Sequence, residues 1–422
     1  MQTEGRIQDE VSHLFRRESG KMVSVLTRVF GPHNIDLVED VVQDTLLKAL
    51  EQWRFRGIPE NPSGWLYTVA KNKALDIVRR ERLKNNLNDE IAYLLKSEYS
   101  VIPTLHELFS KSEIQDDQLR MMFVCCHPSI SQETQVAMIL KTLCGFGVRE
   151  IASAFITNDE VIQKRIYRGK QVFREEQIAL ELPSEVHLED RLDGVLQALY
   201  LLFNEGYSSA SSDELIRKDL AEEALRLTLM LTENERTALP QVYALSALMM
   251  FHLARLSSRI DESGNILLLD EQDRSKWDER FIARGLEYLD RSASGDELTT
   301  YHIEAAIASV HATARSSRET DWAQIVVLYN KLYDKNRSPV TALNRSIAIS
   351  ELKGPKAGLA AIDTIENLNL LHDYFLLPAA KGEFYSRLND TENAYKYFTE
   401  ALNLTDSVYE KKLLQKKIAR LE

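Results

Sequence analysis

The chain has 422 residues, and its 52 Lys and Arg against 64 Asp and Glu give a formal net charge of −12 with histidine neutral. This balance argues against a simple nucleic-acid binder. Only 16 Gly and 10 Pro occur, about half the usual share of ~12%, which disfavours a turn-rich all-β chain and low-complexity disorder alike. We therefore expect helical structure, and at ~100 to 200 residues per domain the length allows two to four domains.

Targeting and membrane signals are absent from the sequence. The first ten residues lack the basic and apolar regions of a secretory signal. The most apolar window, residues 243–251, is much shorter than the ~20 residues that a spanning helix needs. Three cysteines, two of them adjacent, cannot form a disulfide framework. We expect a cytoplasmic protein that makes no membrane contact.

Charge is distributed unevenly along the chain. Residues 1–180 carry 24 basic and 25 acidic side chains, whereas residues 181–422 carry 28 and 39. Within the first part, residues 71–84 hold six basic and two acidic residues, and residues 161–174 hold five basic and no acidic ones. The sequence thus predicts two basic helices in a near-neutral first part, followed by an acidic extension.

The first predicted functional helix covers residues 37–50. Helical spacing places one face toward the core, made of Val38, Val41, Val42, Thr45 and Ala49. The opposite polar stripe consists of Asp40, Gln43, Asp44 and Leu47. A leucine within a polar stripe is either an incidental exposed residue or the apolar anchor of a partner-binding face, and the pattern alone leaves both open.

A turn-rich loop is predicted from Trp53 to Glu60, followed by a helix that runs to about Lys84. Asn61 suits the N-cap of this helix, with Pro62 at its first position. Its inward face comprises Leu66, Val69, Ala70 and Ile77, and its outer side comprises Trp65, Thr68, Asn72, Asp76 and Arg79, flanked by Lys71, Arg80 and Arg82. Cationic, amide and aromatic groups on one face suit contact with phosphates and unpaired bases. A solvated basic helix with Trp65 in the core is the alternative.

Residues from about 85 to 115 predict a linker, and a helix-turn-helix follows it. Its helices are expected at residues 131–143 and 148–155 and from residue 157 onward, where Thr157 and Glu160 would form a capping box. The last helix has an inward face of Ile162, Ile166, Gly169 and Phe173, an outward face of Lys164, Arg168 and Gln171, and Arg165 and Lys170 at the flanks. Its N-terminal part, Asp159 to Gln163, can reach base edges in the major groove. A plain helical hairpin with a solvated cationic face is the alternative.

The sequence offers no convincing catalytic, cofactor or metal site. Cys125, Cys126 and His127 point in different directions on a helix, and no second ligand pair has a suitable spacing, so we expect core burial. The run from Tyr200 to Tyr207 and the stretch around His302 are interpreted as helix packing, because no nucleophile and base are convincingly paired there.

Residues beyond a boundary near 182–184 predict long helices only. Breaks are expected at residues 208–213, 261–265, 291–297 and 335–339. Two similar turns begin at Leu352 and Leu388, 36 residues apart, close to the ~34-residue period of tetratricopeptide helix pairs. Stacked helix pairs are therefore predicted, although two copies do not establish a repeat array.

Three stretches together resemble a sigma-70-type initiation factor of the extracytoplasmic-function class. They are Glu39–Asp44, Asn61–Arg80 and Val148–Arg174, and they look like regions two and four of that family over roughly the first 175 residues. The resemblance implies an all-α fold with a region 2 domain at residues 1–85, a linker at 86–115 and a helix-turn-helix region 4 domain at 116–180. Many helix-turn-helix units have glycine in the turn, where this chain has Ile156.

The resemblance also implies roles for individual residues and no enzymatic activity. Core RNA polymerase, through its clamp and flap surfaces, would be bound mainly by Asp40, Gln43, Asp44 and Leu47. The −10 promoter element would be contacted, together with the loop after Trp53, by Asn61, Trp65, Lys71, Asn72, Asp76, Arg79 and Arg80. The −35 element would be read by Asp159, Gln163, Lys164, Arg165, Arg168 and Lys170.

Residues 184–422 exceed the length of a minimal factor of this class. The runs Tyr200–Tyr207 and Glu271–Trp277, with the late helix pairs, look like the subgroup that carries a tetratricopeptide-like C-terminal extension. That resemblance implies regulation through a regulatory protein or an intramolecular contact of the extension. The charge split adds the hypothesis that the acidic extension folds back over the basic helices when DNA is absent.

Two other function classes remain as alternatives. One is a ligand-sensing helix-turn-helix regulator that acts on duplex DNA without being a polymerase subunit. The acidic helix with Leu47 and the aromatic loop argue against it, because such a regulator needs no single-strand capture. The other is an enzyme with a site around Asn204, Glu205 and His302, which a strongly perturbed carboxylate in a pocket would support.

Overall fold

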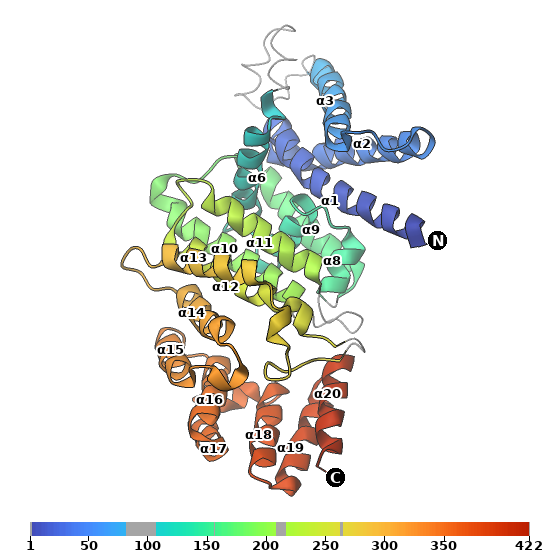
Figure 1. The fold of residues 1–422 in the computed structure, drawn as a ribbon. Coiled ribbons are helices and arrows are strands. Elements are labelled where there is room, and N and C mark those ends of the chain that lie inside the picture. Colours follow the sequence, from blue (N-terminus) through green and yellow to red (C-terminus); the bar gives the residue numbers. More distant parts are fainter. Residues whose placement is uncertain (1, 82–106, 156, 208–216, 262–264, 422) are drawn as a thin grey trace. The chain divides into compact units, whose positions relative to one another are not determined.

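The computed structural model describes residues 2–81, 107–155, 157–207, 217–261 and 265–421. The chain divides into two compact units, unit 1 (Met1–Leu202) and unit 2 (Phe203–Glu422). Every regular element in these described ranges is helical, and an isolated β-bridge between Ile260 and Ile266 is the sole strand-like pairing in them (Figure 1). The predicted all-α fold class is confirmed.

Unit 1 consists of two groups of helices. The first group is α1 (Gln2–Phe30), the short helix η1 (Pro32–Asn34), α2 (Ile35–Arg56) and α3 (Pro62–Glu81). The second group is α6 (Lys111–Cys125), α7 (Gln132–Thr142), α8 (Val148–Ala154) and α9 (Asp159–Glu175). Most of the predicted linker lies outside the described residues, and α6 begins at Lys111, inside the range expected for that linker.

Helix α1 packs against α2 and α3 of its own group and against α6 and α7 of the second group, and it approaches the second group closely at Gly20. A Cβ atom on Gly20 would lie 1.9 Å from the carbonyl oxygen of Leu143, just after α7. Next to this crossing, Gly145 has a φ of +69°, and a Cβ there would lie 2.5 Å from the carbonyl oxygen of Arg16. Side chains are excluded at both glycines by backbone atoms, which cannot rotate away. The lack of a side chain at these two glycines therefore allows direct backbone contact between the two groups of helices.

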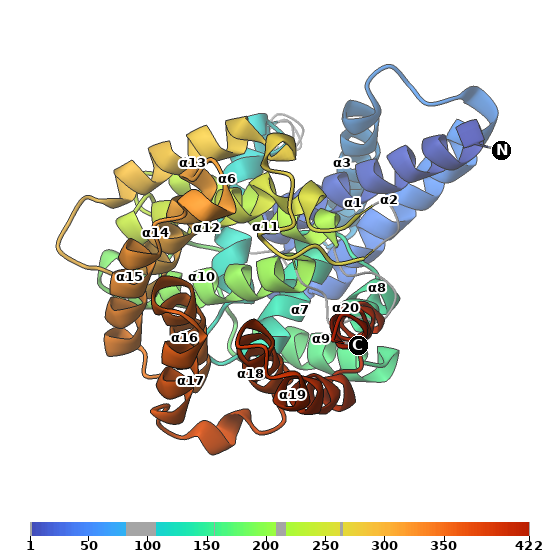
Figure 2. The ribbon, with the colours of Figure 1, turned by 60° about the horizontal axis from the view of Figure 1, so that its bottom comes forward.

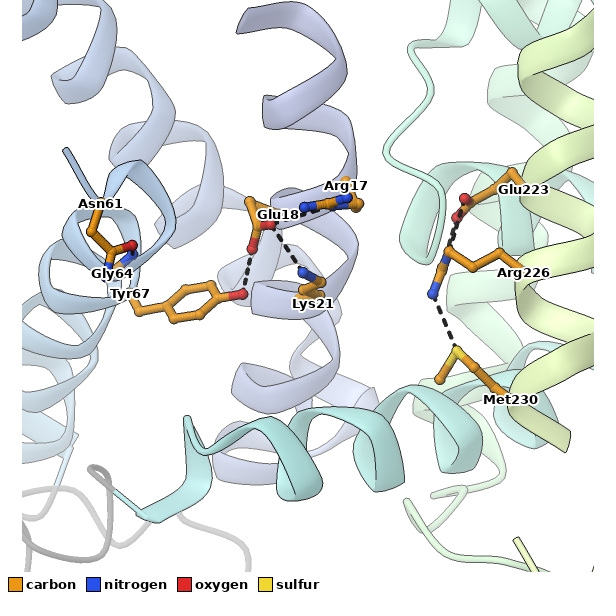
Figure 3. A network of polar contacts seen from close by, with 9 residues as sticks. All are labelled: Arg17, Glu18, Lys21, Asn61, Gly64, Tyr67, Glu223, Arg226 and Met230. Atoms are coloured by element: carbon orange, nitrogen blue, oxygen red, sulfur yellow. Dashed lines mark hydrogen bonds and ion pairs between the residues drawn. The ribbon is translucent and has the colours of Figure 1, made fainter. Parts of the chain in front are cut away.

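A buried carboxylate links α1 to α3. The Glu18 side chain is fully buried; Tyr67 donates a hydrogen bond to its Oε2, and Lys21 Nζ lies 2.9 Å from its Oε1 (Figure 3). Burial alone would raise the pKa of Glu18, but these hydrogen bonds and the charges of Lys21 and Arg17 lower it below its usual value. Glu18 is therefore a charged, paired group in the core of the first group.

Helix α10 (Glu185–Tyr207) runs across the boundary between the two units. Its first part belongs to unit 1: Leu188 and Leu192 are buried, and Arg191 Nη2 donates a 2.6 Å hydrogen bond to the carbonyl oxygen of Phe123 on α6. Gln132 Nε2 on α7 donates to Gln197 Oε1 at 3.2 Å. Unit 1 therefore extends past the sequence-based boundary near residues 182–184.

Unit 2 continues as a succession of helices packed against their chain neighbours (Figures 1 and 2). They are α11 (Lys218–Thr232), α12 (Pro240–Ala254), α13 (Glu279–Ser292), α14 (Thr300–Thr313), α15 (Trp322–Lys335), α16 (Pro339–Lys353), α17 (Pro355–Asp363), α18 (Leu376–Arg387), α19 (Thr391–Leu404) and α20 (Val408–Ala419). The predicted breaks at 291–297 and 335–339 fall between helices, as expected. The break at 208–213 lies outside the described residues.

The two similar turns noted in the sequence each join a pair of helices. Gly354, with a φ of +90°, separates α16 from α17, and Leu388 to Asp390 separate α18 from α19. Close contact within each pair depends on a glycine, because a Cβ on Gly358 would lie 2.7 Å from Cβ of Ser350 on α16, and one on Gly382 would lie 2.6 Å from Cδ1 of Phe398 on α19. Helix pairing at these positions is confirmed, and the assignment to a tetratricopeptide-like repeat stays a prediction.

Candidate polymerase and nucleic-acid interfaces

Helix α2 separates a buried face from an exposed polar stripe, as the sequence predicts. All five side chains of the predicted core face are buried, namely Val38, Val41, Val42, Thr45 and Ala49. Asp40, Gln43 and Asp44 are exposed, and Leu47 is 57% exposed in the middle of their stripe. Asp44 also bonds to Lys73 on α3 at 2.7 Å, so part of the stripe is tied to the neighbouring helix.

The expected loop at Trp53 is partly wrong. Helix α2 continues to Arg56 and ends at Gly57, which has a φ of 77° and donates its N–H to the carbonyl oxygen of Trp53. Trp53 is therefore a buried helical residue, packed 5.4 Å from Phe15 and 5.5 Å from Trp65 between ring centroids. The exposed apolar side chains here are Phe55, at 85% exposure, and Ile58.

Helix α3 begins where the sequence predicts, and its outer face is exposed. Asn61 Oδ1 accepts a hydrogen bond of 2.9 Å from the N–H of Gly64. The exposed members of the predicted −10 set are Asn61, Asn72, Asp76, Arg79 and Arg80, whereas Trp65 is half-buried. Lys71 is buried, which lowers the pKa of its ammonium group. The predicted end of the helix near Lys84 lies outside the described residues.

The three helices expected at residues 131–143, 148–155 and from residue 157 onward are present as α7, α8 and α9, and their assignment to a helix-turn-helix stays a prediction. Ile162, Ile166, Gly169 and Phe173 of α9 are buried, as predicted. Gly169 is needed for the contact with α7, because a Cβ there would lie 2.7 Å from Cγ of Met138. Cys125 and Cys126, before α7, are buried, which is also as predicted.

The predicted capping box at the start of α9 is wrong by one residue. Asn158 is the N-cap, and its side-chain oxygen accepts a hydrogen bond of 2.9 Å from the N–H of Val161. Asn158 thus satisfies the N–H of Val161, one residue beyond the Glu160 N–H that a Thr157 cap would bind. Ile156, the expected turn residue, lies outside the described residues.

The outward residues of α9 divide into a free half and an engaged half. Gln163, Lys164 and Arg168 are exposed, and so is Tyr167, an aromatic residue that the sequence analysis did not select. Asp159 and Arg165 are half-buried. The free half therefore carries amide, cationic and aromatic groups together.

The engaged half of α9 contacts the first turns of α2. Lys170 Nζ lies 2.9 Å from Oδ1 of Asp36 and 2.9 Å from Oε2 of Glu39, and Arg174 also pairs with Asp36. Burial alone would lower the pKa of Lys170, but the charges and hydrogen bonds of Glu39 and Asp36 raise it above its usual value. The periodicity of each helix gave no signal of this contact, because its partners are more than 130 residues apart in the sequence.

Further ion pairs join the two groups of helices in unit 1. Arg16 Nη2 lies 2.5 Å from Oε1 of Glu150 on α8, and Arg28 pairs with Glu113 on α6. Asp117 on α6 is also close to Arg28, at 3.6 Å. Ion pairs and direct backbone contacts thus join the first and second groups of helices in unit 1.

The site suggested around Asn204, Glu205 and His302 has a structural explanation in part. Both ring nitrogens of His302 are engaged: Nδ1 at the cap of α14 with Thr299, and Nε2 at 3.1 Å from the carbonyl oxygen of Ser292. Burial raises the pKa of Glu205. His302 therefore serves as a helix cap and leaves no ring nitrogen free to act as a base.

Comparisons with known proteins give three findings. Residues 14–84 match the sigma-70 region 2 family, and residues 191–293 match a family of unknown function (DUF6596). An uncharacterized protein of Rhizobium meliloti (strain 1021) is 33% identical over 388 residues, which cover 92% of this chain and 90% of that protein. No solved structure gives a significant match.

These findings establish the family at a coarse level. A sigma-70 region 2 domain indicates binding to RNA polymerase and recognition of promoters, and the sigma-70 family is a non-enzymatic family of transcription factors. No described helix is long and apolar enough to cross a membrane. The chain belongs to the same family as the Rhizobium meliloti protein, and its N-terminal region 2 domain supports its place among the sigma-70 family sigma factors.

Proposed function

We propose that this chain is an alternative sigma factor of the extracytoplasmic-function class, which directs transcription initiation at promoters with −10 and −35 elements. The match of residues 14–84 to sigma-70 region 2 supports the assignment of the N-terminal helices. The helix order, lengths and basic exposed face of α8 and α9 support a helix-turn-helix of the region 4 type.

The observation that carries this proposal is the exposed stripe of α2. Leu47 is more than half exposed among acidic and amide side chains, while the opposite face of the same helix is buried. An apolar side chain ringed by polar groups on a rigid helix is a common anchor of protein interfaces. Asp40, Gln43, Asp44 and Leu47 would form the main contact with core polymerase.

The outer face of α3 and the loop after α2 would hold the −10 element. Asn72, Arg79 and Arg80 are exposed along one side of α3, where they can bind phosphates and base edges. Phe55 adds an exposed ring at the end of α2, and an aromatic face of this kind can stack on an unpaired base. We therefore add Phe55 to the single-strand contacts and assign a packing role to Trp53.

Helix α9 would read the −35 duplex in two steps. Gln163, Lys164 and Arg168 are exposed and free to make the first contacts. Lys170 is engaged with Asp36 and Glu39, so its contact with a DNA phosphate requires α9 to leave α2. We infer that full −35 binding includes the opening of this ion-pair contact.

The C-terminal helical domain would regulate this activity. Residues 191–293 match a family of unknown function. The effect of this domain is therefore measured by comparing transcription by the full chain with transcription by a chain that lacks the domain. A truncation after residue 180 would remove α10, whose first part packs on α6 and α7. A chain that ends after Tyr207 keeps α10 complete and is the better truncation.

The decisive experiment is a run-off transcription assay with core RNA polymerase, combined with a binding assay without DNA. We expect a promoter-dependent transcript when the chain is present. We also expect the chain to bind core polymerase in the absence of DNA. Leu47→Asp should weaken core binding by at least about tenfold, equivalent to ~1.4 kcal/mol. The matched control is Leu370→Asp, which changes a leucine of unit 2 that is 70% exposed and should have no effect.

The result also separates the proposal from the duplex-only regulator. A regulator of that kind would bind DNA without binding core polymerase. No run-off product in the presence of the chain, or equal core affinity for the Leu47 and Leu370 variants, would refute the assignment of α2 as the polymerase contact.

A further inference from the structure

Two sequence runs that the proposed function does not use both contact the turn that follows α12 in unit 2. Tyr207 ends the first run, and Arg274 and Trp277 lie in the second. Tyr207 lies at the end of α10, while Arg274 begins the short helix η3 (Arg274–Lys276) and Trp277 follows it. Arg255 and Arg259, which flank the short helix η2 (Leu256–Ser258) after α12, lie between them in the chain.

Three guanidinium groups gather around these aromatic rings. Arg259 Cζ lies 3.9 Å and Arg255 Cζ 5.7 Å from the centre of the Tyr207 ring. Arg274 Cζ lies 4.7 Å from the centre of the Trp277 ring. The backbone carbonyls that these arginines bind are neutral: Arg259 donates to Tyr207, and Arg274 Nη1 donates to His311 and Ala314 at 2.6 and 2.7 Å.

No carboxylate in the described ranges forms an ion pair with any of the three arginines. Two histidines lie beside these arginines: the His252 ring is 4.7 Å from the Tyr207 ring between centroids, and the His311 carbonyl oxygen accepts from Arg274. Burial and the charges of Arg255 and Arg274 lower the pKa of His311 to about 4. Burial and the charges of Arg255 and Arg259 likewise lower the pKa of His252 well below its usual value. The two imidazoles are therefore neutral, and among the described residues no carboxylate pairs with the cluster.

Several buried polar atoms of the same residues have no hydrogen-bond partner in the described part of the chain. They are Tyr207 Oη, Arg274 Nη2, Trp277 Nε1 and His311 Nδ1. Tyr207 and Trp277 are at least nine-tenths buried. The indole and guanidinium nitrogens can only donate, so the group that satisfies them must accept hydrogen bonds.

A positive cluster of this kind destabilises the fold. The three guanidinium groups are half-buried, so solvent screens part of their mutual repulsion, and each unsatisfied buried donor costs about 1–3 kcal/mol. A tetrahedral oxyanion removes both costs together, because it supplies negative charge and several acceptor oxygens in the geometry that guanidinium groups bind.

We propose that unit 2 contains a binding site for a phosphate group, formed by Arg255, Arg259 and Arg274 with Tyr207 and Trp277. The ligand is inorganic phosphate or a small phosphate monoester. The aromatic rings would form the walls of the site. Arg274 Nη2 and Trp277 Nε1, which have no hydrogen-bond partner among the described residues, would donate to the oxyanion. The site lies mainly within the residues that match the family of unknown function and does not depend on the proposed polymerase role.

The test is a calorimetric and thermal-unfolding titration of the full chain with inorganic phosphate at constant ionic strength. We expect saturable binding and a rise in Tm that follows the phosphate concentration, because the ligand binds the folded state alone. Parallel titrations with glycerol phosphate and with acetate separate a phosphate monoester site from a general anion effect. Stronger binding of the monoester identifies an esterified ligand, and binding of inorganic phosphate alone identifies the free ion.

Two variants probe the site directly. Arg255→Met should reduce phosphate affinity by at least about tenfold and should raise Tm in phosphate-free buffer, since it removes an uncompensated charge. An arginine with only a packing role would instead lower Tm under both conditions. Trp277→Phe keeps the ring and removes the N–H, so it should weaken binding severalfold; it provides the answer if the Arg255 variant does not fold.

Two control variants exclude binding elsewhere. Arg337→Met removes an exposed arginine of unit 2 that pairs with Glu366, and Arg168→Met removes an exposed arginine of α9. Both should leave phosphate binding unchanged. The absence of binding heat and of any Tm rise with phosphate would overturn the proposal, as would an equal loss of affinity in the Arg255, Arg337 and Arg168 variants.

Discussion

The Lys170–Glu39 pair should contribute about 2 kcal/mol of coupling energy to unit 1. Both side chains are almost entirely buried, at 11% and 12% exposure, and their charged atoms are 2.9 Å apart. Glu39 Oε1 has no hydrogen-bond partner in the described ranges, so removal of Lys170 would leave this carboxylate buried without compensation. Lys170→Met should therefore cost about 3 kcal/mol, whereas Glu39→Gln should cost about 1–2 kcal/mol because Asp36 still pairs with Lys170.

A double-mutant cycle measures this coupling. The double variant Glu39→Gln with Lys170→Met should lose about 2 kcal/mol less than the sum of the two single changes. Urea unfolding followed by tryptophan fluorescence reports on unit 1 if Trp277 and Trp322 are first replaced by Phe, because Trp53 and Trp65 then remain as the fluorophores. This background avoids mixing the unfolding of the two units.

The matched control is Glu51→Gln, which removes a carboxylate from an exposed position of the same helix. It should change the free energy of unfolding by less than ~0.5 kcal/mol and should show no coupling to Lys170→Met. A coupling energy below about 0.5 kcal/mol between Glu39 and Lys170 would refute the reasoning, since the two helices would then be held by other contacts.

Three further predictions use the same fluorescence assay. Tyr67→Phe should cost about 1–3 kcal/mol, because it removes a hydrogen bond to the fully buried Glu18 carboxylate; unchanged stability would mean that Lys21 alone satisfies Glu18. Gly20→Ala should lower the free energy of unfolding by about 3 kcal/mol, because the new Cβ would lie 1.9 Å from a backbone oxygen. Its control is Gly194→Ala in α10, where the space around the glycine is open; this change should stabilise unit 1 by up to about 1 kcal/mol. Burial raises the pKa of Asp117 to about 7, so the folded state holds a proton that the unfolded state has released. The free energy of unfolding should then fall as pH rises from about 4 to about 7, by up to ~1.4 kcal/mol per pH unit, and Asp117→Asn should remove this slope; an equal slope in both proteins would contradict it.

Helical periodicity predicted which faces of α2 and α9 are buried, because burial follows the 3.6-residue period directly. The buried residues of both helices match that prediction. The same reasoning failed at the ends of α2 and α9, where capping decides. Helix α2 continues past the expected start of the loop at Trp53 and ends before Gly57, and Asn158 replaces Thr157 as the cap of α9. Gly57 and Asn158 are both residue types that cap helices. The sequence alone did not show which of several neighbouring residues would be the cap.

The sequence could not predict contacts between distant elements. Glu39 lies in a stretch that resembles region two, and no role was predicted for Asp36. Both carboxylates nevertheless bind Lys170, which is more than 130 residues away in the sequence. The arginine cluster of unit 2 was missed for the same reason. Its residues are spread from Tyr207 to His311, and its signal is the absence of a carboxylate partner in the described structure, which no local pattern contains.

The acidic residues at the start of α2 have two effects that depend on each other. Asp36 and Glu39 lie near the N-terminus of α2, where negative charge stabilises the helix, and they neutralise Lys170 of α9. DNA phosphates would compete with these carboxylates for the same ammonium group. If the contact is worth about 2 kcal/mol, it lowers the apparent affinity of α9 for DNA by about 30-fold. Glu39→Gln should therefore strengthen binding of the free chain to −35 duplex DNA more than Glu51→Gln does, although both remove one negative charge. Equal strengthening would mean that net charge, and not the contact between α2 and α9, limits DNA binding.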